Sequence, residues 1–375
     1  MGGEKKLFLL DAFALIYRAY FAFAKNPRIN SKGLDTSAVF GFANSLIEVI
    51  KKQKPSHLAV VFDTPKPTQR HVEFPSYKAH REAMPEGISE ALPYIDKLLE
   101  VLNIPKIYKE GFEADDVIGT LAKQGEKQGY KVYMMTSDKD FAQLVSENIF
   151  MYRPGNKWQP TQTWGIKEVL EKFNIKRVNQ VIDFLAMMGD AADNIPGISG
   201  VGKKTAQKFI AEYDSIEGLF ANADSLKGKI QEKVKASKEI GMMSKKLVTI
   251  ITDVPIHFDE ENMKLDISNK EGVSSFFEEL EFRNINSRLF REDIVVEEPI
   301  KQEEIDNDVS HTAQIDMFLP QEKKLKNIKP SSEKKNQLTC SSVDQLRMFS
   351  EQVVENNILF FQSVISNSSN QEKII

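Results

Sequence analysis

Three short apolar runs in the N-terminal part of the chain each end at an aspartate. They are residues 7–10 with Asp11, residues 58–62 with Asp63, and residues 132–136 with Asp138. A short, continuously apolar run is typical of a strand that is buried on both faces of a parallel sheet. Helical patterns at residues 37–52 and 115–125 separate the runs, so the pattern predicts a parallel α/β sheet flanked by helices. We expect the three aspartates to gather at the carboxyl edge of this sheet, where open α/β sheets place their sites.

A helical pattern predominates after residue 175. An apolar-periodic helix is predicted at residues 178–188, a glycine-punctuated stretch follows at residues 196–204, and helical patterns continue to Arg291. We therefore predict two parts, an α/β core at residues 1–175 and a helical subdomain at residues 176–291.

Composition limits the class of protein. The chain has 375 residues, of which 41% are hydrophobic and 28% charged, as in ordinary soluble globular proteins. Its one cysteine, Cys340, excludes a disulfide framework and a cysteine-rich zinc site. No apolar run is long enough to span a membrane and the start lacks the apolar region of a signal peptide, so we expect a cytoplasmic protein without membrane contact. A net charge of −4 counts mildly against nucleic-acid binding, but net charge hides how the charges are distributed.

Nine acids stand out because they cluster at predicted strand ends or beside turns. They are Asp11, Asp63, Glu113, Asp115, Asp116, Asp138, Asp140, Asp190 and Asp193. A single aspartate is most often a helix cap or a turn residue, and Asp115 or Asp116 alone could cap the helix that follows. Carboxylates packed this closely repel one another, however, and are kept together where cations neutralise them. Oxygen ligands without histidine or cysteine favour Mg²⁺ or Mn²⁺, and the number of acids suggests two ions, the usual arrangement for phosphodiester cleavage.

Seven motifs occur in one order along the chain, at residues 10–20, 39–42, 61–63, 77–81, 111–116, 136–140 and 188–197. Together they resemble the 5′-nuclease domain of bacterial DNA polymerase I, a family related to flap endonucleases and phage 5′-exonucleases. The resemblance implies a PIN-like or resolvase-like α/β sheet, followed by a helix–hairpin–helix subdomain of the helix–three-turn–helix type. It also implies that all nine acids are metal ligands, with Asp11, Asp63, Glu113 and Asp115 toward one ion and Asp138, Asp140, Asp190 and Asp193 toward the other.

Glycines and lysines are concentrated at residues 196–206, and the important ones are Gly197, Gly200, Gly202, Lys203 and Lys204. The glycines let the backbone approach a phosphate closely, and the lysines add positive charge at the start of the following helix. Such a hairpin grips the backbone of a duplex without reading its sequence. The same spacing also occurs in ordinary turns. By the resemblance, this is the duplex-binding hairpin, and K⁺ would bind to its backbone carbonyls.

The segment at residues 66–90 mixes basic and aromatic side chains. A solvated basic helix is the ordinary explanation of such a charge run. The resemblance implies instead an arch for single-stranded 5′ ends, with cations on phosphates and aromatic rings on bases. The expected contacts are Lys78 and Arg81 with the scissile phosphate, Tyr77 with a base, and Arg18 and Arg70 with the nucleic acid. Lys139 lies between two predicted ligands, but strand alternation would point it away from them.

The implied activity is that of a structure-selective 5′–3′ exonuclease and flap endonuclease, which hydrolyses DNA and RNA primers by a two-metal mechanism. The implied partner is double-stranded DNA with a 5′ flap, a nick or an RNA primer, in Okazaki-fragment maturation and repair. We expect a monomer without an obligate protein partner. No polymerase activity is expected of this chain alone, because the sequence contains no polymerase domain.

The composition changes again after the predicted helical subdomain. Residues 292–336 are acidic, then basic and polar, which favours a flexible linker. Hydrophobic patterning resumes at residues 337–375, with a predicted helix at residues 343–354. We expect the truncated start of a 3′–5′ exonuclease-like domain there. It would be inactive, because the strand at residues 359–364 lacks the paired acids that such domains use to bind metal.

Two alternative functions stay open. A PIN-type ribonuclease of the toxin sort shares the acid-lined parallel sheet, but it is usually much shorter and lacks both the hairpin and the arch. A non-catalytic DNA-binding or scaffold protein could retain the same fold. The complete set of nine acids argues against this second alternative, because loss of activity normally costs some ligands.

Overall fold

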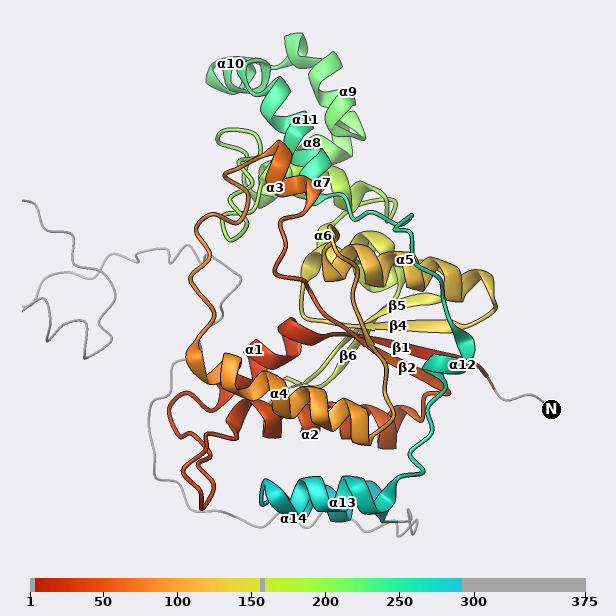
Figure 1. The fold of residues 1–375 in the computed structure, drawn as a ribbon. Helices are drawn as coiled ribbons and strands as arrows, with labels where there is room; N and C mark the ends of the chain where they lie inside the picture. The colour runs from red at the N-terminus through yellow and green to blue at the C-terminus, as the bar shows by residue number, and fades with distance from the viewer. Residues whose placement is uncertain (1–3, 156–158, 292–375) are drawn as a thin grey trace, which may run out of the picture. The chain divides into compact units, whose positions relative to one another are not determined.

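A six-stranded sheet is the centre of the N-terminal part of the protein in the computed structural model, which describes residues 4–155 and 159–291 (Figure 1). The strand order is β3-β2-β1-β4-β5-β6, with β6 antiparallel to β5 and all other pairs parallel. The strands are β1 (Lys6–Asp11), β2 (His57–Val61), β3 (Lys106–Ile107), β4 (Lys131–Met135), β5 (Ile149–Arg153) and β6 (Gln162–Trp164). The three strands predicted from apolar runs are confirmed as β1, β2 and β4, which are neighbours in this sheet.

The strand order changes direction at β1. From β1 the chain adds β2 and β3 on one side, then crosses to add β4 and β5 on the other. In β1, Leu10 pairs with Val60 of β2 and with Met135 of β4, so the three strands end at nearly the same level. A switch point of this kind opens a crevice at the carboxyl ends of the strands. The three strand-end aspartates therefore share one edge.

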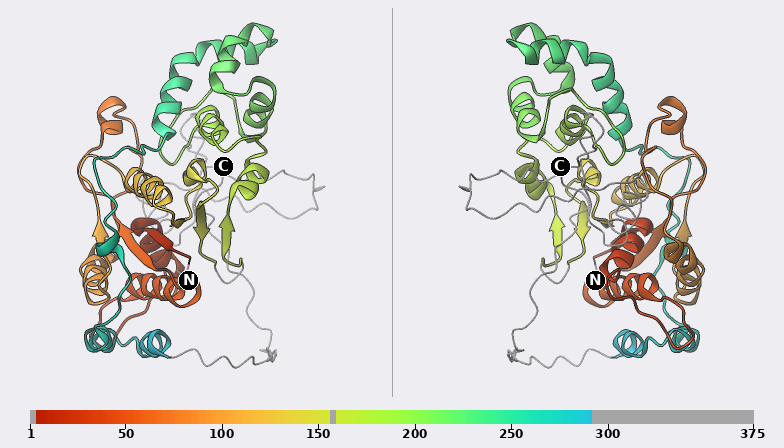
Figure 2. Two further views of the ribbon diagram at one scale, coloured as in Figure 1. Left: turned by 90° about the vertical axis from the view of Figure 1, so that its right-hand side faces the viewer. Right: turned by 90° about the vertical axis from the view of Figure 1, so that its left-hand side faces the viewer.

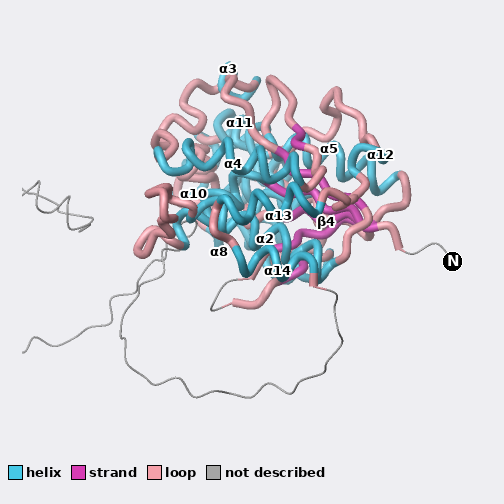
Figure 3. Tube along the Cα trace, turned by 60° about the horizontal axis from the view of Figure 1, so that its bottom comes forward, coloured by secondary structure: helices cyan, strands magenta, loops and turns pink. Residues whose placement is uncertain are grey.

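Alternate side chains of β1 face two different hydrophobic clusters. Leu7 and Leu9 pack in a cluster with α5, whereas Phe8 and Leu10 pack with α1, α2 and α4. Burial on both faces explains why the strand is continuously apolar. The helices are α1 (Ala12–Ala22), α2 (Ser37–Gln53), α4 (Glu86–Val101) and α5 (Ala114–Lys127). Figure 1 shows α5 on one side of the sheet and α1, α2 and α4 on the other, and in Figure 3, viewed from the side of α13 and α14, the strands lie behind α2.

Five further helices, α7 to α11, make up the first part of the segment that was predicted to be a helical subdomain. The prediction of a helix at residues 178–188 is confirmed by α7, and the glycine hairpin lies between α7 and α8. Figure 2 shows these helices grouped together in green. They are α7 (Gln180–Met188), α8 (Lys203–Tyr213), α9 (Ile216–Ala221), α10 (Lys229–Ala236) and α11 (Lys238–Val248).

The chain returns to the α/β core after α11. Val273 and Phe276 of α13 and Ile285 of α14 pack in the same cluster as α2 and α4. The predicted subdomain at residues 176–291 therefore divides in two, because a helical pattern identifies helices but not the surface that each one covers. The remaining helices are α3 (Gln69–Glu73), α6 (Ile166–Phe173), α12 (Glu260–Met263), α13 (Lys270–Glu279) and α14 (Arg283–Phe290).

Two predicted segments, the linker at residues 292–336 and the exonuclease-like start at residues 337–375 with Cys340, lie outside the described residues. Within the part of the chain that the structure describes, no helix combines the length and the apolar character needed to cross a membrane.

Candidate active site

Asp11 and Asp63 lie at the carboxyl ends of β1 and β2, as predicted. Asp11 caps α1, since its Oδ1 accepts a hydrogen bond from the N–H of Ala14 at 3.2 Å, and its Oδ2 accepts one from the Thr136 hydroxyl at 2.9 Å. Asp63 Oδ1 accepts from the N–H of Ala114, the first residue of α5, at 2.8 Å. The bond from Thr136 joins the end of β4 to the end of β1, and the bond from Ala114 joins the start of α5 to the end of β2. Together they fix both carboxylates at the edge of the sheet.

Asp138 and Asp140 follow β4, where a short 3₁₀ helix, η1 (Lys139–Leu144), begins. Asp138 caps this helix by accepting a hydrogen bond from the N–H of Asp140 at 3.0 Å. The N–H of Asp138 donates to the hydroxyl of Thr136 at 3.1 Å. Thr136 thus bonds Asp138 as well as Asp11 and holds the acids of two strands together.

Glu113, Asp115 and Asp116 begin α5. Glu113 is the N-cap residue, and its N–H donates to Asp116 Oδ2 at 3.3 Å in a capping box. The N–H of Asp116 in turn donates to Asp115 Oδ1 at 2.7 Å. The helix is therefore capped by Glu113, and neither Asp115 nor Asp116 is the cap residue.

The last two predicted acids, Asp190 and Asp193, lie on the turn after α7. Two backbone hydrogen bonds of 2.8 and 2.7 Å join Asp190 to Ile195 and close this turn. The N–H of Lys78 donates to the carbonyl of Asp193 at 2.9 Å. The arch segment is thus attached through its backbone to the turn that carries these acids.

Burial and mutual repulsion oppose ionisation of several of the acids. Burial, and after it the neighbouring Asp63, raise the pKa of Asp11 to about 7. Burial first and nearby carboxylates second raise the pKa of Asp115 and of Asp140 well above the usual range. One oxygen of Asp140, Oδ1, is also buried without a hydrogen-bond partner in the described part of the chain. Such a cluster favours cations.

Lys78 and Arg81 reach the acids from the arch segment. Lys78 Nζ lies 3.0 Å from Glu113 Oε1 and 4.0 Å from Asp193 Oδ2, and Arg81 Nη2 lies 2.7 Å from Asp193 Oδ1. Burial opposes ionisation of Glu113, but Lys78 and then Arg70 hold its pKa below the ordinary value. Lys78 has φ 57°, which is uncommon for a side chain other than glycine and is found at functional sites. Both predicted phosphate contacts therefore lie beside the acids.

The acids do not form a ready-made ligand set for a single divalent ion among the described residues. Among the described residues, no three acidic, histidine or cysteine side chains converge in the geometry of a ligand set for one ion. Lysine and arginine side chains contact several of the acids instead. The donors nevertheless suit a hard divalent cation, because all of them are carboxylate oxygens and several have raised pKa values.

Asp116 and Arg70 form a buried ion pair, and this contradicts both of their predicted roles. Asp116 is 1% exposed and Arg70 is 7% exposed. Both oxygens of Asp116 accept from the guanidinium, which also donates to the carbonyls of Leu247 and Thr249 at 3.1 and 2.9 Å. Asp116 is thus a structural acid rather than a metal ligand, and Arg70 is too buried to contact nucleic acid.

Two further expectations are wrong. Tyr77 is 4% exposed and its hydroxyl donates to Glu113 Oε2 at 3.0 Å, so its ring is too buried to stack on a base. The ammonium of Lys139 does not point away from the acids, because it pairs with Asp190 and lies 4.0 Å from Asp140 Oδ1. Lys139 begins a 3₁₀ helix instead of continuing β4, so strand alternation does not apply to it.

The predicted hairpin has the backbone that its glycines suggest. Gly197 and Gly200 adopt φ angles of 64° and 78°, in the left-handed region that favours glycine. A Cβ at Gly197 would lie 2.5 Å from a backbone nitrogen of the preceding turn, so no larger residue fits there. Gly202 is the N-cap of α8, and Lys203 and Lys204 are its first two residues and are exposed. This arrangement is that of an anion-binding helix start.

Lys233 of α10 was not among the predicted contacts. A Cβ at Gly200 would lie 2.8 Å from its Nζ, which places this exposed cation against the hairpin. Lys233 is one of several lysines in α10, so the sequence does not indicate that this one lies against the hairpin. Arg18, which was predicted to contact phosphate, is half-buried and donates to the carbonyl of Gly155. Its contact with nucleic acid stays a prediction.

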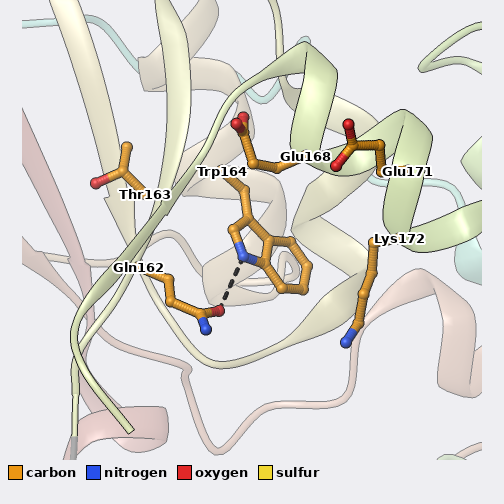
Figure 4. Close-up of a pocket in the computed structure, with 6 residues that line it drawn as sticks. All are labelled: Gln162, Thr163, Trp164, Glu168, Glu171 and Lys172. Carbon is orange, nitrogen blue, oxygen red and sulfur yellow. Dashed lines mark hydrogen bonds between the residues drawn. The ribbon is translucent and has the colours of Figure 1, made fainter.

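A surface hollow on β6 and α6 shares no lining residue with the acid cluster (Figure 4). It is lined by Gln162, Thr163, Trp164, Glu168, Glu171 and Lys172. Trp164 donates from Nε1 to Gln162 Oε1 at 3.1 Å, and the centre of its ring is 4.4 Å from the guanidinium carbon of Arg153 and 5.6 Å from Nζ of Lys172. The hollow is thus built around a packed tryptophan, and none of its residues belongs to the predicted site.

Comparison with known proteins gives matches over both parts of the described chain. The family model of the N-terminal resolvase-like domain of 5′-3′ exonucleases matches residues 6–174, and that of the C-terminal SAM fold of 5′-3′ exonucleases matches residues 176–271. The DNA polymerase I of Bacillus subtilis (strain 168) is 38% identical over 307 residues, which cover 81% of this chain and 34% of that protein. The chain thus spans about a third of the length of the curated DNA polymerase I relatives that it matches.

A shorter relative is covered almost completely. The 5′-3′ exonuclease of Aquifex aeolicus (strain VF5) is 36% identical over 281 residues, which cover 75% of this chain and 94% of that protein. A solved structure of the bacteriophage T5 flap endonuclease with DNA and metal ions has a TM-score of 0.55 and 20% identity, and the match covers 76% of this chain and 100% of that one. This likeness supports the fold. On these matches, the chain belongs to the 5′-3′ exonuclease family.

Proposed function

We propose that the chain is a divalent-metal-dependent 5′-nuclease that hydrolyses phosphodiesters in duplex DNA with a 5′ flap or a nick. The observation that carries this proposal is the position of Lys78 and Arg81, which reach from the arch segment to acids at the carboxyl edge of the sheet. The turn with Asp193 leads directly into the glycine hairpin. A duplex held by the hairpin would therefore have its phosphates close to the acids.

Two ions, Mg²⁺ or Mn²⁺, suit the remaining eight acids, now without Asp116. We assign Asp11, Asp63, Glu113 and Asp115 to one ion, and Asp138, Asp140, Asp190 and Asp193 to the other. When bound, such ions lower the pKa of a water molecule and stabilise the charge on the leaving oxygen. The raised pKa of Asp11 supports cation binding in the first group, and Oδ1 of Asp140, which accepts no hydrogen bond from the described residues, supports it in the second.

The side chains of the protein would bind and orient the substrate. Lys78 now contacts Glu113, and Arg81 contacts Asp193. When DNA binds, both cations would leave these carboxylates and donate charge-assisted hydrogen bonds to oxygens of the scissile phosphate, which would hold the phosphate beside the acids. The hairpin would hold the duplex through backbone N–H groups and its two lysines, independent of sequence. K⁺ would bind to carbonyl groups of the same hairpin. Arg18 would add a further phosphate contact.

The relatives support the same class of substrate. The Aquifex aeolicus protein is a 5′-3′ exonuclease, and the bacteriophage T5 flap endonuclease was solved with DNA and metal ions. We therefore infer that the substrates include 5′ flaps, nicks and RNA primers, and that the activity serves DNA replication and repair in the cytoplasm. The chain would act as a monomer.

Cleavage of a flap duplex labelled at its 5′ end tests the proposal. We expect 5′-phosphorylated products with Mg²⁺ or Mn²⁺, no cleavage with EDTA, and none by Asp138→Asn. The control is Asp253→Asn at an exposed position, which should cleave like the wild type. Cleavage of single-stranded RNA alone would favour a PIN-type ribonuclease. Tight binding of the flap without cleavage under any metal would favour a non-catalytic DNA-binding protein.

A further inference from the structure

Lys139 lies inside the acid cluster. Its ammonium pairs with Asp190 and is 4.0 Å from Oδ1 of Asp140. The Lys139 side chain is 28% exposed, and those of Asp190 and Asp140 are 16% and 15% exposed. One partly buried ammonium is therefore placed between two acids that come from different parts of the chain.

The backbone fixes this contact on both sides. Asp138 accepts from the N–H of Asp140, which starts the 3₁₀ helix and turns Lys139 out of the line of β4. The N–H of Ala192 donates to Asp190 Oδ1 at 2.8 Å, so the other oxygen of Asp190 receives the ammonium. Unlike the cations of the arch segment, Lys139 belongs to the same loop as two of the acids. It therefore accompanies them whatever the position of the arch.

The charges in this group do not balance. Asp138, Asp140 and Asp190 together carry three negative charges when ionised, and Lys139 supplies one positive charge. Within residues 4–155 and 159–291, no donor forms a hydrogen bond with the buried Oδ1 of Asp140. The excess negative charge attracts a divalent ion, but an ion that uses the Oδ2 of Asp190 must displace the ammonium or bind beside it. Like charges a few ångströms apart repel one another strongly in a partly buried site.

We propose that Lys139 is a built-in counter-ion of the Asp140–Asp190 half of the site. It stabilises the acids when no metal is bound, and it competes with a divalent ion for Asp190. The inference rests on the proposed function, because it takes these acids to be metal ligands. It makes Lys139 a determinant of metal affinity, and this half of the site binds its ion more weakly than its carboxylates alone would allow.

Two substitutions separate the charge of Lys139 from its shape. Lys139→Met keeps an unbranched apolar stem and removes the charge, whereas Lys139→Arg keeps the charge. Binding of Mn²⁺ to the full chain is measured by isothermal titration calorimetry, and the melting temperature is measured in EDTA. We expect Lys139→Met to tighten the weaker Mn²⁺ site about tenfold, because one like charge is removed from its vicinity. We expect its melting temperature in EDTA to fall by about 4 °C or more.

Lys139→Arg should keep both values close to those of the wild type, and Lys66→Met, at an exposed ion pair with Glu110, is the control for loss of a surface charge. Lys139→Gln replaces the Met variant if that variant does not fold. Unchanged or weaker Mn²⁺ binding in the neutral variant overturns the inference. Such a result in the neutral variant leaves the proposed function intact, provided that the wild type cleaves flaps and binds Mn²⁺. A wild type that neither cleaves flaps nor binds Mn²⁺ overturns the proposed function itself.

Discussion

Arg70 and Asp116 face each other in a two-point ion pair, with distances of 2.7 Å from Nη1 to Oδ2 and from Nη2 to Oδ1. The same guanidinium donates to the carbonyls of Leu247 and Thr249, where the chain leaves α11. Its Nη1 also lies 3.3 Å from Glu113 Oε2. Arg70 therefore joins the arch segment, the start of α5 and the exit from the helical subdomain, and it holds Glu113 and Asp116 in place.

Replacing Arg70 by methionine should strongly destabilise the protein. The carboxylate of Asp116, which is 1% exposed, would lose the cation that pairs with both of its oxygens. Removing one partner of a buried ion pair costs about 3–5 kcal/mol. We expect a loss of this size in the free energy of unfolding, measured by urea denaturation in EDTA.

A matched control is Lys66→Met, which removes one partner of an exposed ion pair with Glu110. Exposed pairs contribute about 0–1 kcal/mol, so this variant should unfold close to the wild type. The double variant Arg70→Met with Asp116→Leu should regain much of the lost stability, because both charges are removed together. An Arg70→Met variant as stable as the wild type would show that the pair does not position α5.

The strand-end acids could be predicted because their signal is local. A continuous apolar run predicts a buried parallel strand, and the residue after it must lie at the carboxyl edge, so Asp11 and Asp63 needed no knowledge of distant contacts. The role of Asp116 could not be found in this way. It follows Asp115 directly, and only the tertiary contact with Arg70, 46 residues away, distinguishes a structural acid from a candidate ligand.

Burial of the arch residues was equally invisible in the sequence. Tyr77 and Lys78 are neighbours, and the aromatic and basic pattern suggested that both face the nucleic acid. The structure instead buries the ring of Tyr77 against Glu113 and directs the ammonium of Lys78 to the same carboxylate. This geometry depends on the left-handed backbone of Lys78. Lysine has no preference for that conformation, so the sequence does not predict it.

Lys78→Met and Arg81→Met should each lower the rate of cleavage of a bound 5′ flap. Both side chains lie beside the acids, where they can stabilise a phosphate as its charge develops. Loss of one such donor typically lowers kcat by about 10²–10³. Single-turnover cleavage with saturating protein measures this effect apart from binding. Lys270 is exposed on α13, outside the arch segment, and Lys270→Met should cleave within about twofold of the wild type. Cleavage by Lys78→Met and Arg81→Met at the rate of the wild type would show that neither side chain acts in the site.

Replacing both Lys203 and Lys204 by alanine should weaken duplex binding without changing any base preference. Each lysine that neutralises a phosphate contributes about 0.9 to the slope of log K against log salt, so the double variant should lose about 1.8 from that slope. Fluorescence anisotropy over a salt series, with EDTA to prevent cleavage, measures the slope. Lys264 and Lys270 are exposed lysines outside the hairpin, and their double alanine variant should keep the slope of the wild type. The same slope in both double variants would exclude the hairpin as the duplex grip.

Asp11→Asn should stabilise the metal-free protein at alkaline pH. Burial, with a smaller contribution from Asp63, raises the pKa of Asp11 to about 7 in the folded chain, above its value near 4 in the unfolded chain. The folded state therefore prefers the protonated form, so this contribution to stability is complete below pH 4 and is lost as the pH rises through 7. In EDTA, the asparagine variant should be more stable than the wild type by about 1–3 kcal/mol at pH 8 and nearly equal to it at pH 4.5. Adding Mn²⁺ at pH 8 should raise the melting temperature of the wild type more than that of the variant, because the ion replaces the missing proton. An equal difference between the two proteins at both pH values would show that the carboxylate of Asp11 is not destabilised in the folded site.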